Sequence, residues 1–178
     1  MASIPPGPNP PGELYVVVEI PKGSKVKYEF KFEMSIIAVD RILFTAMAYP
    51  YNYGIIPGTL MPDGDPLDAL IIVNEAFIPG SLIKVRPIGA LEMEDEAGID
   101  HKLITVPSSD VDPSAENIKD ISDLSTATLN QIKHFFEHYK DLEPGKWSRV
   151  RRFLGVEEAM KMVLEAMKRY EDHKHEIH

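Results

Sequence analysis

The chain changes its pattern once, and this change constrains the fold more than any other feature. Between residues 14 and 106, short runs rich in β-branched and aromatic residues alternate with Pro, Gly and Asp, which is typical of strands joined by turns. After about residue 115 the apolar residues recur at three- and four-residue spacing, which is typical of helices. Strands first and helices second predict an α+β domain built on an antiparallel sheet or barrel.

The expected elements follow from these two patterns. The predicted strands cover residues 14–20, 26–32, 36–42, 67–73, 82–91 and 102–106. One helix is expected to include Leu129 and to end at Pro144, and a second is expected to begin near Val156. A chain of 178 residues with 44% hydrophobic content is long enough to bury one core, so we expect a single domain over residues 1–178.

Three carboxylates stand close together where a predicted turn meets a predicted strand. They are Asp63, Asp65 and Asp68, in the segment Asp-Gly-Asp-Pro-Leu-Asp. Their negative charges repel each other unless a cation is held there, and hard divalent cations such as magnesium prefer oxygen ligands. Asp and Gly are also common in ordinary turns. The segment alone therefore leaves both a magnesium site and a simple turn open.

A second acidic cluster surrounds Gly98 and contains Asp95, Glu96 and Asp100. Like the first, it stands at a strand boundary, where the backbone can fold its carboxylates toward a common ion. Two such clusters indicate a site for more than one metal ion. The alternative is a solvated acidic hairpin tip, which is the usual role of a charge run.

Isolated cations accompany these acids near the strand ends, chiefly Lys27, Arg41, Lys102 and Lys140. Taken singly, each is most simply a surface charge with a buried stem. Taken together with divalent cations, they would leave a site with excess positive charge unless its ligand were highly anionic, and phosphate oxygens suit both partners. The combination favours phosphoryl chemistry. The tyrosines between residues 49 and 53 could donate hydrogen bonds to phosphate without adding charge.

Composition and missing motifs exclude several other classes. The formal net charge of -9 argues against a nucleic-acid partner, and the absence of Cys excludes disulfides and thiolate zinc sites. No P-loop, dinucleotide-binding turn or serine-hydrolase elbow is present. Residues 1–11 lack the pattern of a secretory signal, and no apolar run approaches the length of a membrane span. We therefore expect a cytoplasmic protein that binds neither membranes nor nucleic acid.

The aspartate segment and its flanks together resemble one known family, the soluble family I inorganic pyrophosphatases, and in particular their short prokaryotic type. The resemblance covers nearly the whole chain. Apart from Asp63 to Asp68, it rests on residues 15–21, 27–29, 39–41, 49–54, 95–98 and 134–140, together with Asp100 and Lys102.

This resemblance implies an OB-like five-stranded antiparallel β-barrel with two main helices packed against it, and an enzyme that hydrolyses pyrophosphate to two phosphates with three or four Mg2+ ions per active site. It also implies a homohexamer, with His134 and His138 near the subunit contacts. The positions that match metal ligands are Glu29, Asp63, Asp68, Asp95 and Asp100. The positions that match phosphate-binding residues are Lys27, Arg41, Tyr139 and Lys140. The positions that match supporting residues are Glu19, Tyr49, Tyr53, Glu96 and Lys102.

A mechanism follows from the same residues. Two cations held about 4 Å apart by a shared carboxylate can lower the pKa of a water between them toward neutrality. Asp65 lies next to Asp63 and Asp68 in the sequence and is the expected acceptor of that water's proton. No covalent enzyme intermediate is needed. Two other classes stay open, an OB-like nucleic-acid-binding module and a protein in which metal ions only stabilise the loops.

Overall fold

The computed structural model describes residues 3–176, so the outermost residues of the expected domain, 1–2 and 177–178, lie outside the described part. The strands and helices alternate less simply than the sequence predicts. In chain order they are β1 (Leu14–Ile20), β2 (Val26–Lys31), β3 (Ile36–Ile42), β4 (Asn52–Ile56), β5 (Leu67–Ile71), β6 (Leu82–Asp95), β7 (Gly98–Ile99), β8 (Lys102–Pro107), the 3-10 helices η1 (Pro113–Ala115) and η2 (Ile121–Asp123), α1 (Thr126–His138), β9 (Ser148–Leu154) and α2 (Val156–His173).

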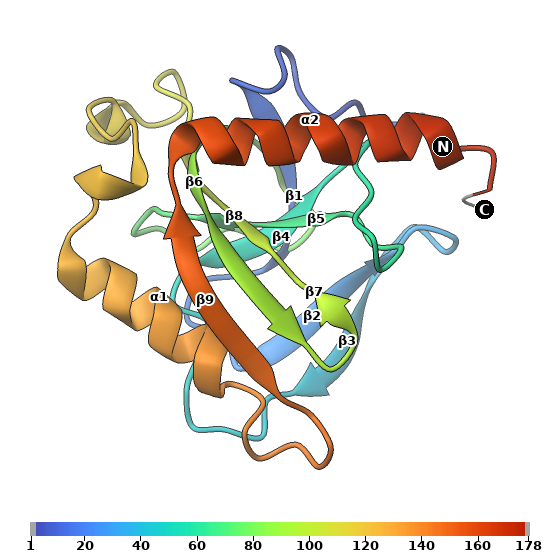
Figure 1. Cartoon of the computed structure of the whole chain (residues 1–178), viewed down its shortest axis with the longest axis vertical. Coiled ribbons are helices and arrows are strands. Elements are labelled where there is room, and N and C mark those ends of the chain that lie inside the picture. Colours follow the sequence, from blue (N-terminus) through green and yellow to red (C-terminus); the bar gives the residue numbers. More distant parts are fainter. Residues whose placement is uncertain (1–2, 177–178) are drawn as a thin grey trace.

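Five strands of the large sheet are paired in a ring (Figure 1). β1 pairs with β4, β4 with β5, β5 with β8, β8 with β6, and β6 again with β1, which makes a ring of strands. All of these pairs are antiparallel except β5–β8, which is parallel. The α+β class is confirmed. The arrangement differs from the expected antiparallel one at β5–β8, because the long strand β6 intervenes in the sequence and gives the chain room to cross over.

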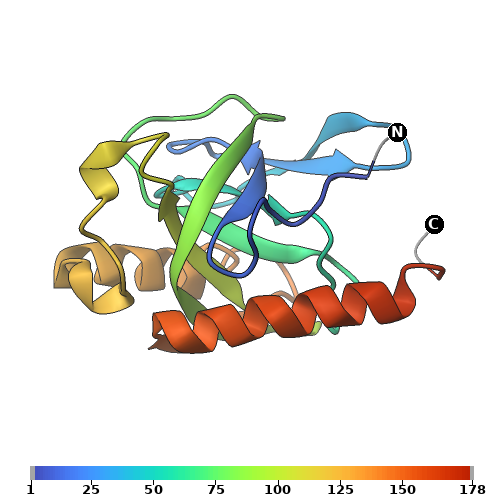
Figure 2. The same cartoon turned by 90° about the horizontal axis from the view of Figure 1, so that it is seen from above.

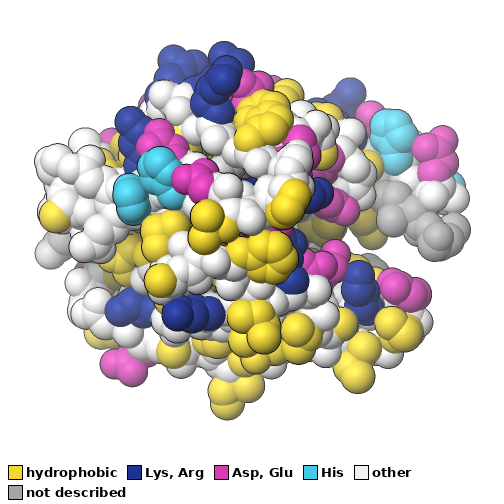
Figure 3. All heavy atoms as spheres, turned by 90° about the horizontal axis from the view of Figure 1, so that it is seen from below, with side chains coloured by type: hydrophobic (Ala, Val, Ile, Leu, Met, Phe, Trp, Pro, Cys, Tyr) yellow, Lys and Arg dark blue, Asp and Glu magenta, His cyan; other side chains and the backbone are white. Residues whose placement is uncertain are grey.

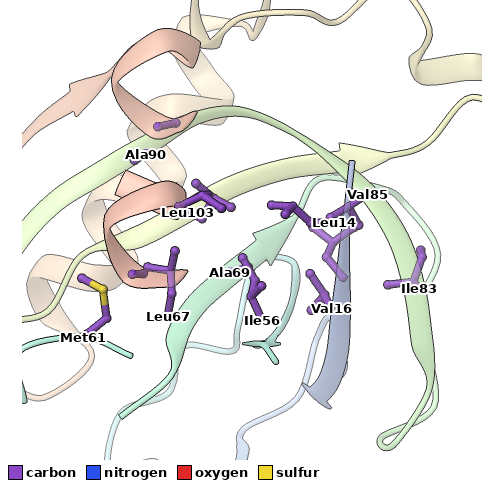
Figure 4. Packing of buried hydrophobic residues seen from close by; sticks show 14 of the residues in the cluster. Leu14, Val16, Ile56, Met61, Leu67, Ala69, Ile83, Val85, Ala90 and Leu103 are labelled. Carbon is purple, nitrogen blue, oxygen red and sulfur yellow. The ribbon is translucent and has the colours of Figure 1, made fainter. Parts of the chain in front are cut away.

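The interior of the ring is a hydrophobic cluster. Figure 4 shows Leu14 from β1, Leu67 from β5, Val85 from β6 and Leu103 from β8 in this cluster, and all four are fully buried. Burying a side chain of this size stabilises the fold by about 1.5–3 kcal/mol. α2 runs along one side of the strands in both Figure 1 and Figure 2 and covers the cluster with its own small buried residues, Ala159, Val163 and Ala166.

A second cluster lies under α1. The helix begins at its cap residue Ser125, whose side chain accepts a hydrogen bond from the Thr128 backbone N–H. Its buried residues Ile132, Phe135 and Phe136 pack in one cluster with side chains of the ring strands and with Tyr49. The helix ends at His138 rather than near Pro144, and this early end releases the segment that carries Tyr139 and Lys140.

β2 and β3 form a separate two-stranded sheet, which we call the hairpin. Its side chains are partly or fully exposed, in contrast to the ring strands. Exposed hydrophobic side chains are a general feature of the face drawn in Figure 3. The exposed hydrophobic residues in and next to the hairpin are Phe32, Met34, Ile36, Val39, Ile42 and Phe44.

The sequence prediction missed the two-residue strand β7 and two longer strands, β4 and β9. β4 is interrupted by Gly54 and follows Pro50, so its composition resembles a turn, yet the whole strand is buried between β1 and β5. β9 has the charged sequence Ser-Arg-Val-Arg-Arg-Phe-Leu and pairs with the far end of β6. Tertiary packing outweighs local propensity in both strands. Within residues 3–176, no helix combines the length and the hydropathy needed to span a bilayer.

Candidate active site

A pocket of about 440 Å³ lies between residues of the ring, the hairpin and the segment after α1. Every site residue predicted from the sequence lines it. These residues are Glu19, Lys27, Glu29, Arg41, Tyr49, Tyr53, Asp63, Asp65, Asp68, Asp95, Glu96, Asp100, Lys102, Tyr139 and Lys140. The folded chain thus brings both acidic clusters and the isolated cations to one place.

The aspartate segment is a turn that also faces this pocket. Gly64 has a φ of +91°, a conformation that glycine adopts without strain, and the Asp65 backbone N–H donates to Asp63 Oδ1 at 3.0 Å. Asp68 follows at the start of β5. Desolvation, together with repulsion from Asp63 and Asp68, raises the pKa of Asp65 above its usual value. The segment is therefore a turn that also lines the pocket, and its role as a magnesium site stays a prediction.

Lys102 joins the two acidic clusters from the floor of the pocket. The parallel register of β5 and β8 places it opposite Asp68, and its Nζ lies 2.9 Å from Asp68 Oδ2 and 2.8 Å from Asp100 Oδ1. The side chain is only 3% exposed. Burial lowers the pKa of Lys102, but the negative charges of Asp68 and Asp100 more than offset this, and the pKa lies well above the usual value. Lys102 is therefore a buried, permanently charged partner of two carboxylates.

The second acidic cluster forms the tip between β6 and β7. Gly98 has a φ of +116° there, and Lys140 from the segment after α1 reaches the tip, with its Nζ 2.9 Å from Asp95 Oδ2 and 3.6 Å from Glu96 Oε1. Burial raises the pKa of Asp100, and the neighbouring charge of Asp68 raises it further. The tip is a hairpin tip that also forms part of the pocket wall, and its role in binding metal ions stays a prediction.

The hairpin supplies the opposite wall. Lys27 and Arg41 face each other in the β2–β3 register, and both approach the same atom, Asp40 Oδ2, at 3.4 Å and 2.6 Å. Their side chains are 29% and 25% exposed, so they stay accessible to a ligand. Glu29 pairs with Lys31 at 2.9 Å. This wall carries its charges on a sheet that is separate from the ring.

Glu19 lies where the two walls meet. It belongs to β1 of the ring, and its Oε2 accepts a hydrogen bond of 2.8 Å from the Phe30 backbone N–H of the hairpin. Burial raises the pKa of Glu19 to about 8, while the hydrogen bond from Phe30 acts in the opposite direction. Glu19 therefore links the hairpin to the ring and favours its neutral form around neutral pH.

Three buried tyrosines complete the pocket. Burial raises the pKa of Tyr49, Tyr53 and Tyr139, so their hydroxyl groups stay protonated and can donate hydrogen bonds. Tyr49 also packs against Tyr53, with ring centroids 5.4 Å apart, and against Phe135 of α1 at 4.7 Å. Aromatic packing and a polar hydroxyl near the site are thus combined in the same residues.

The donor chemistry fits hard divalent cations, although no ligand cage is already assembled. Within residues 3–176, no group of three or more His, Asp or Glu side chains lies close enough together to hold a metal ion. Instead, Lys102 and Lys140 occupy the spaces between the carboxylates. All the acidic side chains of the pocket are oxygen donors, and burial, with a smaller contribution from repulsion between the carboxylates, raises the pKa of Asp65 and Asp100. A divalent cation would relieve that repulsion and suits such ligands.

Comparison with known proteins decides the family. Residues 16–171 match the family described as inorganic pyrophosphatase. The chain belongs to this family. It is 52% identical to the inorganic pyrophosphatase of Aquifex pyrophilus over 94% of each chain. It is also 55% identical to the protein of the same name from Sulfolobus acidocaldarius, over 92% of this chain and 95% of the relative.

Solved structures agree with the family assignment. The inorganic pyrophosphatase of Helicobacter pylori has a TM-score of 0.89 and 51% identity, over 90% of this chain and 94% of that one. The structure from Thermus thermophilus has a TM-score of 0.92 and 40% identity, over 95% and 97%. The prediction that the chain is an enzyme of the inorganic pyrophosphatase family is therefore confirmed.

Several charged residues in or next to the pocket received no role from the sequence. Asp40 was visible beside Arg41 but had no distinguishing pattern, and it pairs with both hairpin cations. Glu143 contacts Arg41 from 102 positions away, which no local pattern reveals. Lys146 lines the pocket and approaches Glu96 at 3.3 Å.

The two helix histidines lie outside this pocket. His134 and His138 are exposed on α1, with ring centroids 4.7 Å apart, and His138 Nδ1 lies 2.7 Å from Asp141 Oδ2. Their assignment to a subunit contact stays a prediction.

Proposed function

We propose that this chain is a magnesium-dependent inorganic pyrophosphatase that hydrolyses pyrophosphate to two phosphates without a covalent intermediate. The observation that carries the proposal is the composition of one pocket, where carboxylates on the ring face partly exposed cations on the hairpin. A small, highly charged anion that arrives with divalent cations satisfies both walls at once. Single-stranded nucleic acid, the alternative left by the sequence, suits so acidic a pocket poorly.

The carboxylates of the pocket are proposed to hold three or four magnesium ions. The residues that would hold them are Glu29, Asp63, Asp68, Asp95 and Asp100. Bound magnesium supplies positive charge for the phosphate oxygens and lowers the pKa of a bound water. The raised pKa of Asp65 suits a residue that takes a proton, because a more basic carboxylate is a better acceptor. Asp65 is proposed as the general base.

The cations and phenols are proposed to bind the phosphates. Lys27, Arg41 and Lys140 would neutralise the charge that develops on the leaving phosphate, and the buried Tyr139 hydroxyl would donate a hydrogen bond. The remaining residues would hold these groups in place. They are Glu19, Tyr49, Tyr53, Glu96 and Lys102.

Lys102 has a specific part in this arrangement. Its ammonium group keeps Asp68 and Asp100 within one hydrogen bond of a common point. Removing the lysine would leave the two carboxylates to repel each other. Lys102 is therefore proposed to hold the ligand carboxylates at a fixed spacing rather than to contact phosphate.

The proposal extends to a single pyrophosphatase domain that acts in the cytoplasm as a homohexamer, without nucleic-acid or membrane partners. Sedimentation of the purified protein tests the assembly, because a monomer and a hexamer of a 20.0 kDa chain differ sixfold in mass. A monomer at assay concentration would remove the hexamer from the proposal and leave the reaction standing.

The direct test of the reaction is phosphate release from pyrophosphate with magnesium, with EDTA, and with magnesium restored. Turnover that requires magnesium is expected. Folded protein that binds magnesium without turning over pyrophosphate would instead support a purely structural metal site. Tight, salt-sensitive binding of single-stranded DNA without turnover would support the nucleic-acid-binding alternative.

A further inference from the structure

Glu143 is a buried carboxylate to which neither the sequence nor the proposed reaction gives a role. It lies in the turn after α1, where its backbone N–H donates to the Lys140 carbonyl at 2.9 Å. Its side chain is only 7% exposed. A carboxylate this well buried requires a partner, because an unpaired buried charge is costly.

That partner is Arg41 of the hairpin. Glu143 Oε1 lies 2.9 Å from Arg41 Nε, and Arg41 NH2 donates to Glu143 Oε2 at 3.4 Å. The close Nε approach is a charge contact only, since Arg41 Nε makes no hydrogen bond of good geometry. On its other side, Arg41 NH1 donates to Asp40 Oδ2 at 2.6 Å. Arg41 is therefore held between two carboxylates from different parts of the fold.

The arrangement leaves the guanidinium group available to a ligand. Arg41 carries five N–H donors in a rigid plane, and the contacts with Asp40 and Glu143 use only part of them. Arg41 also lines the pocket. Because a guanidinium binds an oxyanion best when its plane is already oriented, a fixed Arg41 loses less conformational freedom on binding phosphate than a free one.

We propose that Glu143 is a positioning residue for the diphosphate substrate, which acts by orienting Arg41 from behind. This inference rests on the proposed function, in which Arg41 binds phosphate. The same contact ties the turn that carries Tyr139 and Lys140 to the hairpin that carries Lys27. This contact therefore fixes the positions of the phosphate-binding groups of the two segments relative to each other.

The negative charge of Glu143 repels an anionic substrate, whereas its orientation of Arg41 favours binding. Because the two effects are opposite, the inference is testable. If Glu143 acted through its charge alone, removing that charge would make the pocket more positive and tighten the binding of an anion. If Glu143 acts by orienting Arg41, removing it weakens binding in spite of the gain in positive charge.

The experiment compares Glu143→Gln, which removes the charge, with Glu143→Asp, which keeps the charge but shortens its reach. Both are expected to raise KM for pyrophosphate by about five- to tenfold with a smaller change in kcat, since ground-state and transition-state binding are lost together. Both are also expected to weaken the binding of inorganic phosphate in calorimetry. Unchanged or tighter binding in the Gln variant would overturn the inference, and the Asp variant decides it if the Gln variant unfolds.

Two controls separate this inference from its foundation. Glu92→Gln removes a similar contact, Glu92 Oε2 to Arg152 Nε at 2.9 Å, on the β6–β9 surface, and it is expected to leave KM unchanged.

Arg41→Lys tests the proposed function itself. A raised KM in Arg41→Lys with a normal KM in the Glu143 variants would reject only the positioning role. A normal KM in Arg41→Lys would reject the phosphate-binding role of Arg41. In the Arg41→Lys background, Glu143→Gln is expected to add little.

Discussion

The two walls of the pocket use the same kinds of charged residue in opposite ways. On the ring wall, Lys102 is buried, and two strands of the ring hold it against Asp68 and Asp100. On the hairpin wall, Lys27 and Arg41 keep a quarter or more of their side-chain surface exposed and share Asp40. The buried Lys102 balances fixed charges, whereas the partly exposed Lys27 and Arg41 can still bind an incoming anion. The contrast predicts a division of labour, with most of the proposed metal ligands on the ring wall and with Lys27 and Arg41 binding phosphate from the hairpin wall. Glu29 is the proposed metal ligand that the hairpin contributes.

The largest expected effect lies in the turn that leads into the ring wall. Asp65→Asn removes the proposed general base and should lower kcat by about 10²- to 10⁴-fold, because proton transfer contributes a factor of that order. The fold should survive, since Asp65 is exposed and the Asp65 backbone, not its side chain, forms the turn hydrogen bond. Phosphate-release kinetics measure the loss. Asp112→Asn is the control, at a partly exposed aspartate outside the pocket whose side chain caps η1. Near-normal turnover would remove Asp65 from the mechanism.

The next effect concerns stability. Lys102→Met leaves the partly buried Asp68 and Asp100 without their common partner and should lower the free energy of unfolding by about 3 kcal/mol in metal-free protein. Lys27→Met removes a partly exposed ion pair and should cost less than about 1 kcal/mol. Urea unfolding in EDTA measures both. Equal losses of unfolding free energy in the two variants would contradict the proposed difference between the walls.

Urea unfolding of the same two variants with added magnesium tests metal binding at the ring wall. A divalent cation beside Asp68 and Asp100 would replace part of the charge lost with Lys102, so magnesium should stabilise Lys102→Met more than Lys27→Met. The absence of any magnesium effect on either variant would contradict metal binding at the ring wall.

The hairpin wall should show its main effect in substrate binding. Lys27→Met should raise KM for pyrophosphate by about tenfold, because one charge-assisted contact to phosphate is lost, which corresponds to roughly 1.4 kcal/mol. Steady-state kinetics at saturating magnesium give the value. Lys133→Met, which removes an exposed lysine of α1 outside the pocket, should leave KM unchanged. A Lys27 variant with normal KM would contradict the assignment of phosphate binding to the hairpin.

A pH dependence of stability is expected at Glu19, where the walls meet. The pKa of Glu19 is raised from 4.5 to about 8 in the folded chain, so between these values the folded state binds more protons than the unfolded state. The contribution of Glu19 to stability is therefore fully present below about pH 4.5 and is lost as the pH rises toward 8. Glu19→Gln stays neutral and keeps an acceptor for Phe30.

The test compares wild-type protein with Glu19→Gln by thermal unfolding from pH 5 to pH 9 in EDTA. The wild type should lose stability relative to the variant across this range, and magnesium should reduce the difference. A constant difference at every pH would show that Glu19 does not titrate in this way.

The sequence predicted most of the charged residues that line the candidate pocket, because they occur in short, dense motifs. Asp63, Asp65 and Asp68 share one turn, and Asp95, Asp100 and Lys102 share one tip and the strand after it, so local spacing already places them together. Family resemblance then connected the separate motifs. The geometry supports this grouping, since all of these residues line one pocket.

The unpredicted parts depend on contacts between distant segments. Glu143 meets Arg41 only because the turn after α1 reaches the hairpin. The parallel pairing of β5 with β8 depends on the path of β6, and β9 is a strand because β6 offers it an edge. No periodicity within these segments encodes such contacts.

The most direct test of the division of labour is phosphate release measured as a function of magnesium and of pyrophosphate in Asp100→Asn and Lys27→Met. The ring-wall variant Asp100→Asn should need more magnesium for half-maximal rate, while Lys27→Met should need more pyrophosphate at an unchanged magnesium requirement. Equal shifts in both variants, or turnover that persists in EDTA, would contradict the account.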